Sequence, residues 1–374
     1  MNDEHNAPGA HNEPDAHNEL GALRARIDGI DDAILKLLSE RAGIAQQVGR
    51  AKNGEKIYRP EREAQIVQRL RKANPGPLSG ESVERLIREI MSACRALEQA
   101  IRVAYLGPAG TFSQQAAHKQ FGHEIDALAE ADIDACFHAV ETGRADFAVV
   151  PVENSTEGAI SRTLDLIVSS PLRICGEVML PIHQTLMRKQ GGREGIARVY
   201  GHAQSLAQCQ QWLSRHLPNA EKISVVSNSE GARLAAADPQ AATLGSEAAA
   251  ALYGLLVVES RIEDEASNTT RFLVLGTSDA APSGRDKTSL VVGARNEPGA
   301  VVRLLQPLAD AGISMSKLES RPARLDNRSL GNWEYLFFVV CEGHRQDAKL
   351  AAALAAIESR AAFLKILGSY PAAA

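Results

Sequence analysis

Apolar residues recur at alternating spacings of three and four from Leu20 to Ala51, at positions 20, 23, 27, 30, 34, 37, 44, 48 and 51. This spacing predicts one long helix with a narrow apolar stripe, ending near Asn53 and Gly54. A second helix is expected from Pro60 to about Asn74, and a third from Ser82 to Ile101. Helices of such unequal length cannot cover the stripe of the first, so we expect two chains to pair.

One position of the stripe carries Arg41 instead of an apolar residue. Such an arginine is either a rim residue, whose stem packs while its head reaches water, or a ligand for a buried anion. Charged neighbours favour the anion: Arg24 and Lys52 lie on the same helix, and Glu63 and Glu98 share apolar faces of the second and third helices. Arg24 precedes Arg41 by 17 residues, or about 25 Å of helix. Both can serve one small ligand only if Arg24 comes from an antiparallel partner chain.

After residue 101, β-rich runs alternate with helical ones: RVAYLG precedes a helix from Phe112, and FAVVPVEN precedes a helix from Gly158. This alternation predicts an α/β module over residues 101–277. A break near residues 169–171, with strands at RICGEVML and VVES, predicts two lobes and a ligand cleft between them. A linker, 278–286, leads to a strand, helix, strand, strand, helix, strand order over 287–374, which is the ferredoxin-like α+β arrangement.

Length and composition set the remaining limits. The 374 residues are 44% hydrophobic and 23% charged, enough to bury cores in several domains. The polar residues 1–17 predict a disordered tail before a helical module of residues 18–100. A net charge of -5 argues against nucleic-acid binding. No apolar run reaches about eighteen residues and no secretory signal is present, so we expect a cytoplasmic protein that does not bind a membrane. Scattered cysteines without CxxC spacing favour reduced thiols over disulfides or a metal site.

The stretch LRARIDGIDDAILKLLSERAGIAQQVGRAK, followed by RPERE, resembles the all-helical chorismate mutases at the front of the bifunctional P-proteins, over residues 20–100. The resemblance implies that Arg41, Lys52 and the partner's Arg24 hold the two carboxylates of chorismate. It also implies that Glu63 accepts from the substrate hydroxyl and that Arg62 supports the site by pairing. Because the rearrangement to prephenate is pericyclic, the site has to fold the substrate and stabilise charge on its ether oxygen, which Lys52 and residue 98 would do.

Three positions depart from one common form of this family. Glu98 stands in place of glutamine and can donate a hydrogen bond only when protonated. We expect burial to favour the protonated form, and mutase activity to fall as the pH rises and Glu98 loses its proton. Arg59 stands in place of aspartate and Cys94 in place of serine, so their ligand contacts are left open.

Four strings carry a second resemblance: GPAGTFS (107–113), PVENSTEGAI (151–160), GHAQSLAQC (201–209) and NTTRF (268–272). Each alone also fits ordinary turn or strand chemistry, and GPAGTFS lacks the GK[ST] of a nucleotide loop. Together they resemble prephenate dehydratase over residues 102–277, with two lobes like those of periplasmic binding proteins.

Prephenate dehydratases remove hydroxide and carbon dioxide from prephenate to form phenylpyruvate. This chemistry needs an acid at the hydroxyl and cations or amides at the carboxylates, but no cofactor, oxidant or metal. The resemblance implies that Thr270 assists the leaving hydroxyl, that Arg271 binds or orients a carboxylate and that Phe272 packs the strand. The residues expected to line the cleft are Thr111, Glu153, Asn154, Ser155 and Gln208.

Residues 287–374 resemble an ACT domain of the phenylalanine-sensing kind, through NEPGAVV (296–302) and ESRP (319–322). Ordinary turn chemistry also explains either string. Glycine lets the backbone approach an amino-acid ligand, and the helix start offers N–H groups to its carboxylate. The resemblance implies that L-phenylalanine binds between paired ACT domains and inhibits the dehydratase. The expected effector-binding residues are Asn296, Pro298, Gly299, Ala300, Val301, Glu319, Ser320, Arg321 and Pro322.

These resemblances imply a bifunctional enzyme that converts chorismate through prephenate to phenylpyruvate under phenylalanine control, as a homodimer or larger homo-oligomer. One alternative is a non-catalytic cytoplasmic amino-acid sensor, which the Thr270 and Arg271 pair and the charges of the helical module disfavour. The other is a dehydratase with a degenerate mutase, which the departures at Arg59, Cys94 and Glu98 suggest.

Overall fold

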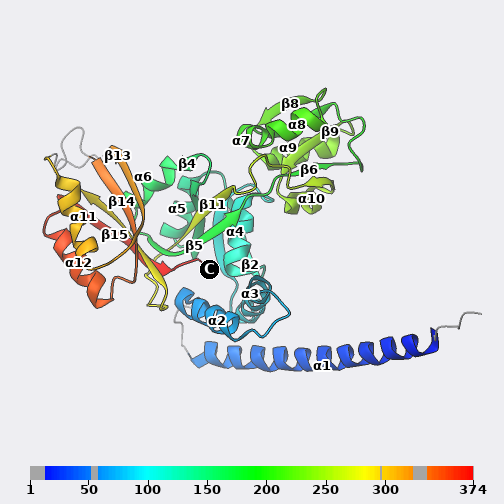
Figure 1. Cartoon of the computed structure of the whole chain (residues 1–374), viewed down its shortest axis with the longest axis horizontal. Helices are drawn as coiled ribbons and strands as arrows, with labels where there is room; N and C mark the ends of the chain where they lie inside the picture. The colour runs from blue at the N-terminus through cyan, green and yellow to red at the C-terminus, as the bar shows by residue number, and fades with distance from the viewer. Residues whose placement is uncertain (1–12, 52–57, 295–296, 323–334, 374) are drawn as a thin grey trace, which may run out of the picture. The chain divides into compact units, whose positions relative to one another are not determined.

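The computed structural model describes residues 13–51, 58–294, 297–322 and 335–373 (Figure 1). The chain divides into two compact units, Met1–Ile57 and Tyr58–Ala374. No helix among the described residues is long and apolar enough to cross a membrane. The five cysteines are all buried, and none of them forms a disulfide.

The first unit contains one helix, α1 (Glu13–Ala51). It begins within the stretch that we expected to be a disordered tail, because Glu13, Pro14 and Asp15 are residues that suit a first helical turn. Its apolar stripe is not buried: Ile30 and Leu37 leave 58% and 64% of their surface exposed. The pairing of two chains along this stripe stays a prediction.

The second unit opens with α2 (Pro60–Ala73) and α3 (Gly80–Ala96). The Ser79 hydroxyl caps α3 by accepting from the backbone N–H of Ser82 at 3.1 Å. Helix α3 ends at Ala96, five residues before the expected end at Ile101. It ends early because Ile101 begins a strand that pairs with Ile125, and strand pairing is incompatible with a continuing helix.

The first lobe of the α/β module is built on a six-stranded sheet of order β2-β1-β3-β11-β5, with β4 paired to β3. Its strands are β1 (Ile101–Leu106), β2 (Ile125–Glu130), β3 (Phe147–Asn154), β4 (Gly158–Ala159), β5 (Arg173–Pro181) and β11 (Thr269–Gly276). Helix α4 (Phe112–Phe121) packs on one face, and α5 (Ile133–Glu141) and α6 (Ser161–Ser169) pack on the other (Figure 1). The helix expected from Gly158 begins instead at Ser161, because Gly158 and Ala159 pair with the end of β3.

The second lobe carries a five-stranded sheet of order β10-β6-β9-β7-β8. Its strands are β6 (Thr185–Arg188), β7 (Arg198–His202), β8 (Glu221–Val225), β9 (Ala241–Gly245) and β10 (Leu256–Ser260), and its helices are α7 (Ala203–Gln208), α8 (Gln210–His216), α9 (Asn228–Ala237) and α10 (Glu247–Tyr253). The chain leaves the first lobe after β5 and returns at β11, which confirms two lobes. The expected break near residues 169–171 is wrong, because β5 pairs with β11 in the first sheet. The VVES stretch lies in β10, within the second sheet, and does not cross between the lobes.

The C-terminal module has the predicted βαββαβ order, and its four strands form a sheet of order β13-β14-β12-β15. The elements are β12 (Asp286–Gly293), α11 (Ala300–Asp310), β13 (Met315–Pro322), β14 (Tyr335–Glu342), α12 (Ala348–Glu358) and β15 (Phe363–Pro371). Helices α11 and α12 pack against one face of this sheet.

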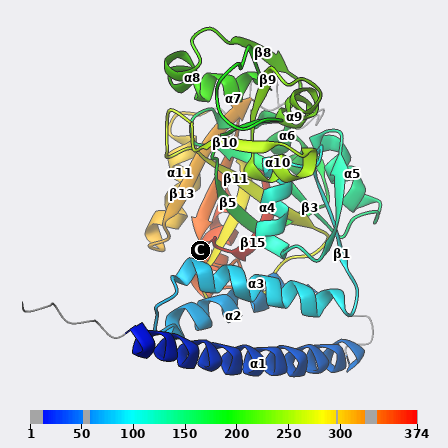
Figure 2. The same ribbon diagram turned by 90° about the vertical axis from the view of Figure 1, so that its right-hand side faces the viewer.

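The other face of the C-terminal sheet shares a hydrophobic core with the first lobe. Phe338 and Tyr370 of the sheet belong to the same cluster as Phe137 of α5, Ile167 of α6 and Leu275 of β11. Strand β15 lies beside β5 (Figure 2). The segment expected to be a linker therefore joins two modules that are packed together rather than separated.

Candidate active and effector sites

The mutase candidates of α1 are Arg24, which is exposed, and Arg41, which is half-buried. Both lie on one continuous helix, so a single chain keeps them about 25 Å apart at 1.5 Å per residue. Lys52 lies outside the described residues. One chain therefore does not bring the two arginines to one ligand.

Glu63 of α2 is largely buried and forms an ion pair with Arg95 of α3. The Arg95 guanidinium also donates to the Phe121 carbonyl at 2.6 Å and lies 5.3 Å from the ring centroid of Tyr58. Arg95 was not among the residues that we predicted. Its spacing of four from the buried Met91 placed it on the buried face of α3, and this signal was available in the sequence.

The remaining mutase candidates differ in exposure. Arg59 precedes the first turn of α2 and is exposed, as is Arg62. Cys94 is buried in α3. Glu98 lies in the turn after α3 and is exposed, so it does not share a helical face with Cys94 and lacks the burial that we expected.

The dehydratase candidates Asn154 and Thr270 meet where β3 and β11 pair. The Asn154 side-chain amide donates to the Thr270 hydroxyl at 2.9 Å and to the side-chain oxygen of Asn268 at 2.8 Å. All three residues are buried. The three side chains form one hydrogen-bonded group at the end of two neighbouring strands.

The orientation of the Asn154 amide follows from its other contacts. Its Oδ1 accepts from the backbone N–H groups of Thr156 at 3.0 Å and Glu157 at 3.3 Å. Backbone N–H groups can only donate, so this end of the amide is the oxygen and the end facing Thr270 is the NH2 group. The Thr270 oxygen is therefore an acceptor for Asn154, and its own hydrogen remains available for another partner.

Two buried polar atoms near these residues have no hydrogen-bond partner among the described residues: Asn268 Nδ2 and Gln184 Oε1. The Gln184 amide donates to Gln208 at 3.1 Å and to Ser205 at 3.2 Å. Buried polar groups are nearly always satisfied, so such atoms are candidate contacts for a ligand or ordered water. Asn268 and Gln184 were not predicted, although Asn268 is the first residue of the NTTRF string.

Thr111 caps α4 and its hydroxyl donates to the Leu106 carbonyl at 3.0 Å. The turn before it contacts the second lobe: Ser246 donates to the Gly110 carbonyl at 2.7 Å, and Ser229 to the Ala109 carbonyl at 2.9 Å. Gly110 has a φ of +84° and packs against Ala249, where a side chain would be both strained and crowded. The GPAGTFS string thus joins the two lobes.

Ser155 accepts from the backbone N–H of Thr269 at 3.0 Å, which ties the ends of β3 and β11 together. Glu153 points away from this group and pairs with Lys317 of β13 at 2.9 Å. Side chains alternate along a strand, so Glu153 faces the C-terminal module when Asn154 faces Thr270 and Asn268. The expected cleft position of Glu153 is therefore wrong within this chain.

Arg271 also faces the C-terminal module. Its guanidinium donates to Glu177 of β5 at 2.9 Å and to the Tyr370 hydroxyl of β15 at 2.9 Å. It binds a carboxylate as expected, but that carboxylate belongs to the protein. Phe272 is buried in the core on the α4 face of the sheet, together with Val178 of β5.

The Glu177 side chain is fully buried, and its carboxylate has three partners. These are the Arg271 guanidinium, the Lys287 ammonium at 2.6 Å and the backbone N–H of Ala373 at 3.1 Å. Burial alone would raise its pKa, but the two cations outweigh burial, so the pKa of Glu177 lies below its usual value. Burial raises the pKa of Tyr370 to about 12. Glu177 is therefore a stable anion at neutral pH.

The first expected effector string lies at the start of α11. Gly299 has a φ of +73° and precedes the helix, with Pro298 before it and Ala300 and Val301 in the first turn. Asn296 lies outside the described residues. A positive φ explains the glycine at this position.

The second expected effector string ends β13. Glu319 lies 3.0 Å from the Lys317 ammonium, and Arg321 lies 3.0 Å from Asp165 of α6. Ser320 and Pro322 are exposed. The charged members of this string therefore face the dehydratase lobe.

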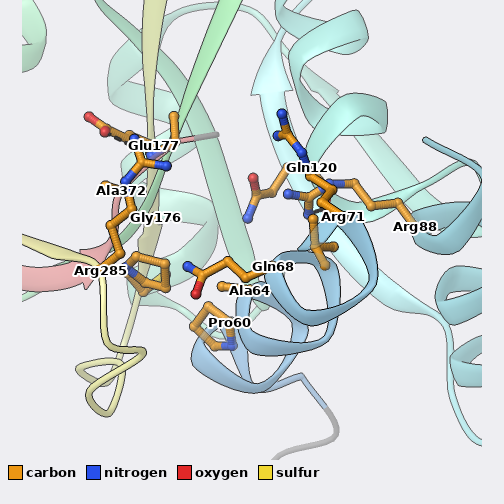
Figure 3. A pocket seen from close by; sticks show the side chains of 14 residues that line it. Pro60, Ala64, Gln68, Arg71, Arg88, Gln120, Gly176, Glu177, Arg285 and Ala372 are labelled. Carbon is orange, nitrogen blue, oxygen red and sulfur yellow. Dashed lines mark hydrogen bonds between the residues drawn. The ribbon is translucent and has the colours of Figure 1, made fainter. Parts of the chain in front are cut away.

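A cavity of about 260 Å³ lies between α2, α3, α4, β5 and the residues after β15 (Figure 3). Figure 3 shows Glu177 and Ala372 on one side and Arg71 and Arg88 on the other. Arg71 and Arg88 are both paired with Glu84. Thr270 and Asn154 are not among its lining residues, so this cavity is not the dehydratase site.

The fold and these groups define a protein with a helical module, a two-lobed α/β module and an ACT-like module. Family models match the chain in the same order: chorismate mutase type II over residues 23–99, prephenate dehydratase over 103–280 and ACT domain over 288–359.

Relatives match nearly the whole chain. A bifunctional chorismate mutase/prephenate dehydratase of Neisseria gonorrhoeae is 54% identical, covering 94% of this chain and 96% of that protein. One of Stutzerimonas stutzeri is 47% identical, covering 95% and 98%. The crystal structure of prephenate dehydratase in complex with L-Phe from Arthrobacter aurescens matches with a TM-score of 0.64 and 32% identity, over 72% of this chain and 89% of that one. The chain belongs to the family of bifunctional chorismate mutase/prephenate dehydratases.

Proposed function

We propose that the helical module rearranges chorismate to prephenate, that the two-lobed module converts prephenate to phenylpyruvate, and that L-phenylalanine inhibits the second step through the ACT domain. Family membership supports both activities. The observation that carries the dehydratase assignment is the Thr270 hydroxyl, whose oxygen accepts from Asn154 at 2.9 Å. Its hydrogen has no acceptor among the residues that the structure describes.

In the dehydratase step, the bond to the substrate carboxylate breaks, carbon dioxide leaves, and the electron pair enters the ring as the hydroxyl departs. The departing oxygen gains negative charge, and a positioned donor lowers the energy of that charge. Thr270 donates a hydrogen bond to this oxygen and keeps its own proton as hydroxide leaves, while Asn154 keeps the hydroxyl turned toward the substrate. The free Nδ2 of Asn268 supplies a second donor, suited to a substrate carboxylate.

For the mutase step, family membership supports roles for Arg41 and Glu63, with the second arginine supplied by a second chain. The exposed stripe of α1 is the surface that would pair, so the protein works as a homodimer or a larger homo-oligomer. The partner's Arg24 and this chain's Arg41 then hold the two carboxylates of chorismate. Glu63 accepts from the substrate hydroxyl and is oriented by Arg95.

Between paired ACT domains, phenylalanine binds with its carboxylate at the start of α11 and its ammonium group near Glu319. The cytoplasmic location expected from the sequence is part of this proposal. Control by phenylalanine requires that the enzyme and free phenylalanine be present in the same compartment.

The test supplies purified protein with chorismate and, separately, with prephenate, with and without phenylalanine. Both products should form, and phenylalanine should lower phenylpyruvate formation alone. Thr270→Val should lower the dehydratase kcat by roughly 100-fold, as loss of one transition-state donor does. Thr269→Val, which removes a hydroxyl from the neighbouring position of β11, is the matched control. Equal kcat values for the two variants would refute the role of Thr270.

A further inference from the structure

Strand β13 contacts the dehydratase lobe through two cations. The Lys317 ammonium lies 2.9 Å from Glu153 at the end of β3. The Arg321 guanidinium lies 3.0 Å from the Asp165 carboxylate and donates to the Ser161 carbonyl at 2.7 Å, both on α6. Because β13 is paired to β14, the two cations are held at a defined spacing on one strand.

These contacts lie on both sides of the segment that holds Asn154. Glu153 precedes Asn154 in β3, and Ser161 begins the helix that follows the 154–160 turn. Asn154 in turn donates to Thr270. A shift of β13 therefore acts on both ends of the turn from which Asn154 reaches the Thr270 hydroxyl.

Lys317 also contacts the expected effector-binding string 319–322, since its ammonium lies 3.0 Å from the Glu319 carboxylate. One cation thus bridges a carboxylate of each module. An amino-acid effector brings its own ammonium group, which competes with Lys317 for Glu319 because two cations at one carboxylate repel each other. The Lys317 side chain is largely buried, at 16% exposed, so it has little room to move. A change in its contact with Glu319 therefore also changes its contact with Glu153.

We propose that Lys317 is the residue that couples the effector site to the dehydratase site, through its bridge from Glu319 to Glu153 and hence to Asn154 and Thr270. The inference rests on the proposed function, because it assigns a regulatory path to that same dehydratase site. Arg321 with Asp165 forms the second attachment of the strand. Lys317 acts on the reaction through Asn154 and does not touch substrate.

This path differs from the buried group of Arg271, Glu177 and Tyr370, which also joins the two modules. Glu177 and Tyr370 are completely enclosed and each is satisfied by several partners, so that group has no partner to exchange with an effector. Lys317 has two competing carboxylates, one of which lies in the effector string. The Lys317 bridge therefore offers a contact that a ligand charge can change.

The test compares wild-type full-length protein with Lys317→Met, which keeps an unbranched side chain and removes the charge. We expect Lys317→Met to bind phenylalanine, measured by calorimetry, while the concentration needed for half-maximal inhibition of phenylpyruvate formation rises at least about tenfold, or 1.4 kcal/mol of coupling. Uninhibited dehydratase turnover and mutase turnover should stay within about twofold of wild type.

Arg345→Met is the matched control, since Arg345 pairs with Asp279 at 2.6 Å and also ties the ACT domain to the preceding segment, away from β13. This control should retain wild-type inhibition. Asp165→Asn is a smaller change, at the contact between Asp165 and Arg321. It should also raise the phenylalanine concentration needed for half-maximal inhibition, and it replaces Lys317→Met as the test variant if that protein does not fold.

Inhibition of Lys317→Met or of Asp165→Asn at the same phenylalanine concentrations as wild type and Arg345→Met would overturn the inference. Loss of inhibition in Arg345→Met as well would also overturn it, since any loosening of the interface would then suffice. If wild type itself makes no phenylpyruvate, or phenylalanine does not inhibit it, the proposed function fails instead.

Discussion

Replacing Glu177 by glutamine tests whether the carboxylate that joins β5, β11 and the ACT strands stabilises the folded chain. The substitution keeps the shape and removes the charge. It leaves Arg271, which is 9% exposed, and Lys287 beside a neutral amide. Breaking one partner of a buried ion pair costs about 3–5 kcal/mol, and the partial exposure of Lys287 places this case near the lower end. A cost of about 3 kcal/mol lowers the Tm by roughly 6–12 °C in a unit of about 150–250 residues. The unit Tyr58–Ala374 is longer, so we expect a fall of about 6 °C or less.

The same prediction has a pH dependence whose sign follows from the lowered pKa of Glu177. A carboxyl group with a depressed folded-state pKa stabilises the protein above its unfolded-state pKa of about 4.5, and this stabilisation is lost as the pH falls through the folded-state value. The difference in Tm between wild type and Glu177→Gln should therefore be largest near pH 7 and should shrink below about pH 4.5.

Thermal unfolding followed by circular dichroism at several pH values provides the assay. Glu230→Gln is the control, because Glu230 pairs with Arg233 on an exposed helix face and such pairs contribute less than about 1 kcal/mol. A Glu177→Gln protein as stable as Glu230→Gln at pH 7, or a difference that grows on acidification, would refute the reasoning.

Three further outcomes are expected. Asn154→Asp should lower the dehydratase kcat by roughly 100-fold with mutase activity unchanged, measured with each substrate separately, because a carboxylate cannot donate to Thr270. Arg95→Met should lower the Tm by leaving Glu63 buried without its cation, and adding Glu63→Gln should restore most of the loss; no restoration would show that Arg95 acts by packing alone. Gly368→Ala should destabilise the chain by about 1–3 kcal/mol in denaturant unfolding, because its Cβ would collide with the Ile174 backbone where β15 meets β5; wild-type stability would contradict that close approach.

Much of the architecture could be read from local patterns. Alternating spacings of three and four located α1, and runs of β-branched residues located the strands of the ACT domain in their correct βαββαβ order. Motifs also placed Asn154 and Thr270 in one expected site. Some errors were at boundaries: α3 ends before Glu98, and the helix after the 154–160 turn begins at Ser161. Element ends depend on what the next residues pair with, and helical periodicity carries no information about strand partners.

The sequence by itself determined which elements form and which motifs they carry, because hydrophobic periodicity, turns and caps act over a few residues. Only the tertiary structure decided which way the site residues point. Asn154 reaches Thr270 across 116 positions, while their neighbours Glu153 and Arg271 face the ACT domain instead of the cleft. Adjacent strand residues point to opposite faces, so the choice between cleft and interface depends on which face the rest of the chain covers. That choice is made by long-range packing, which a local pattern does not contain.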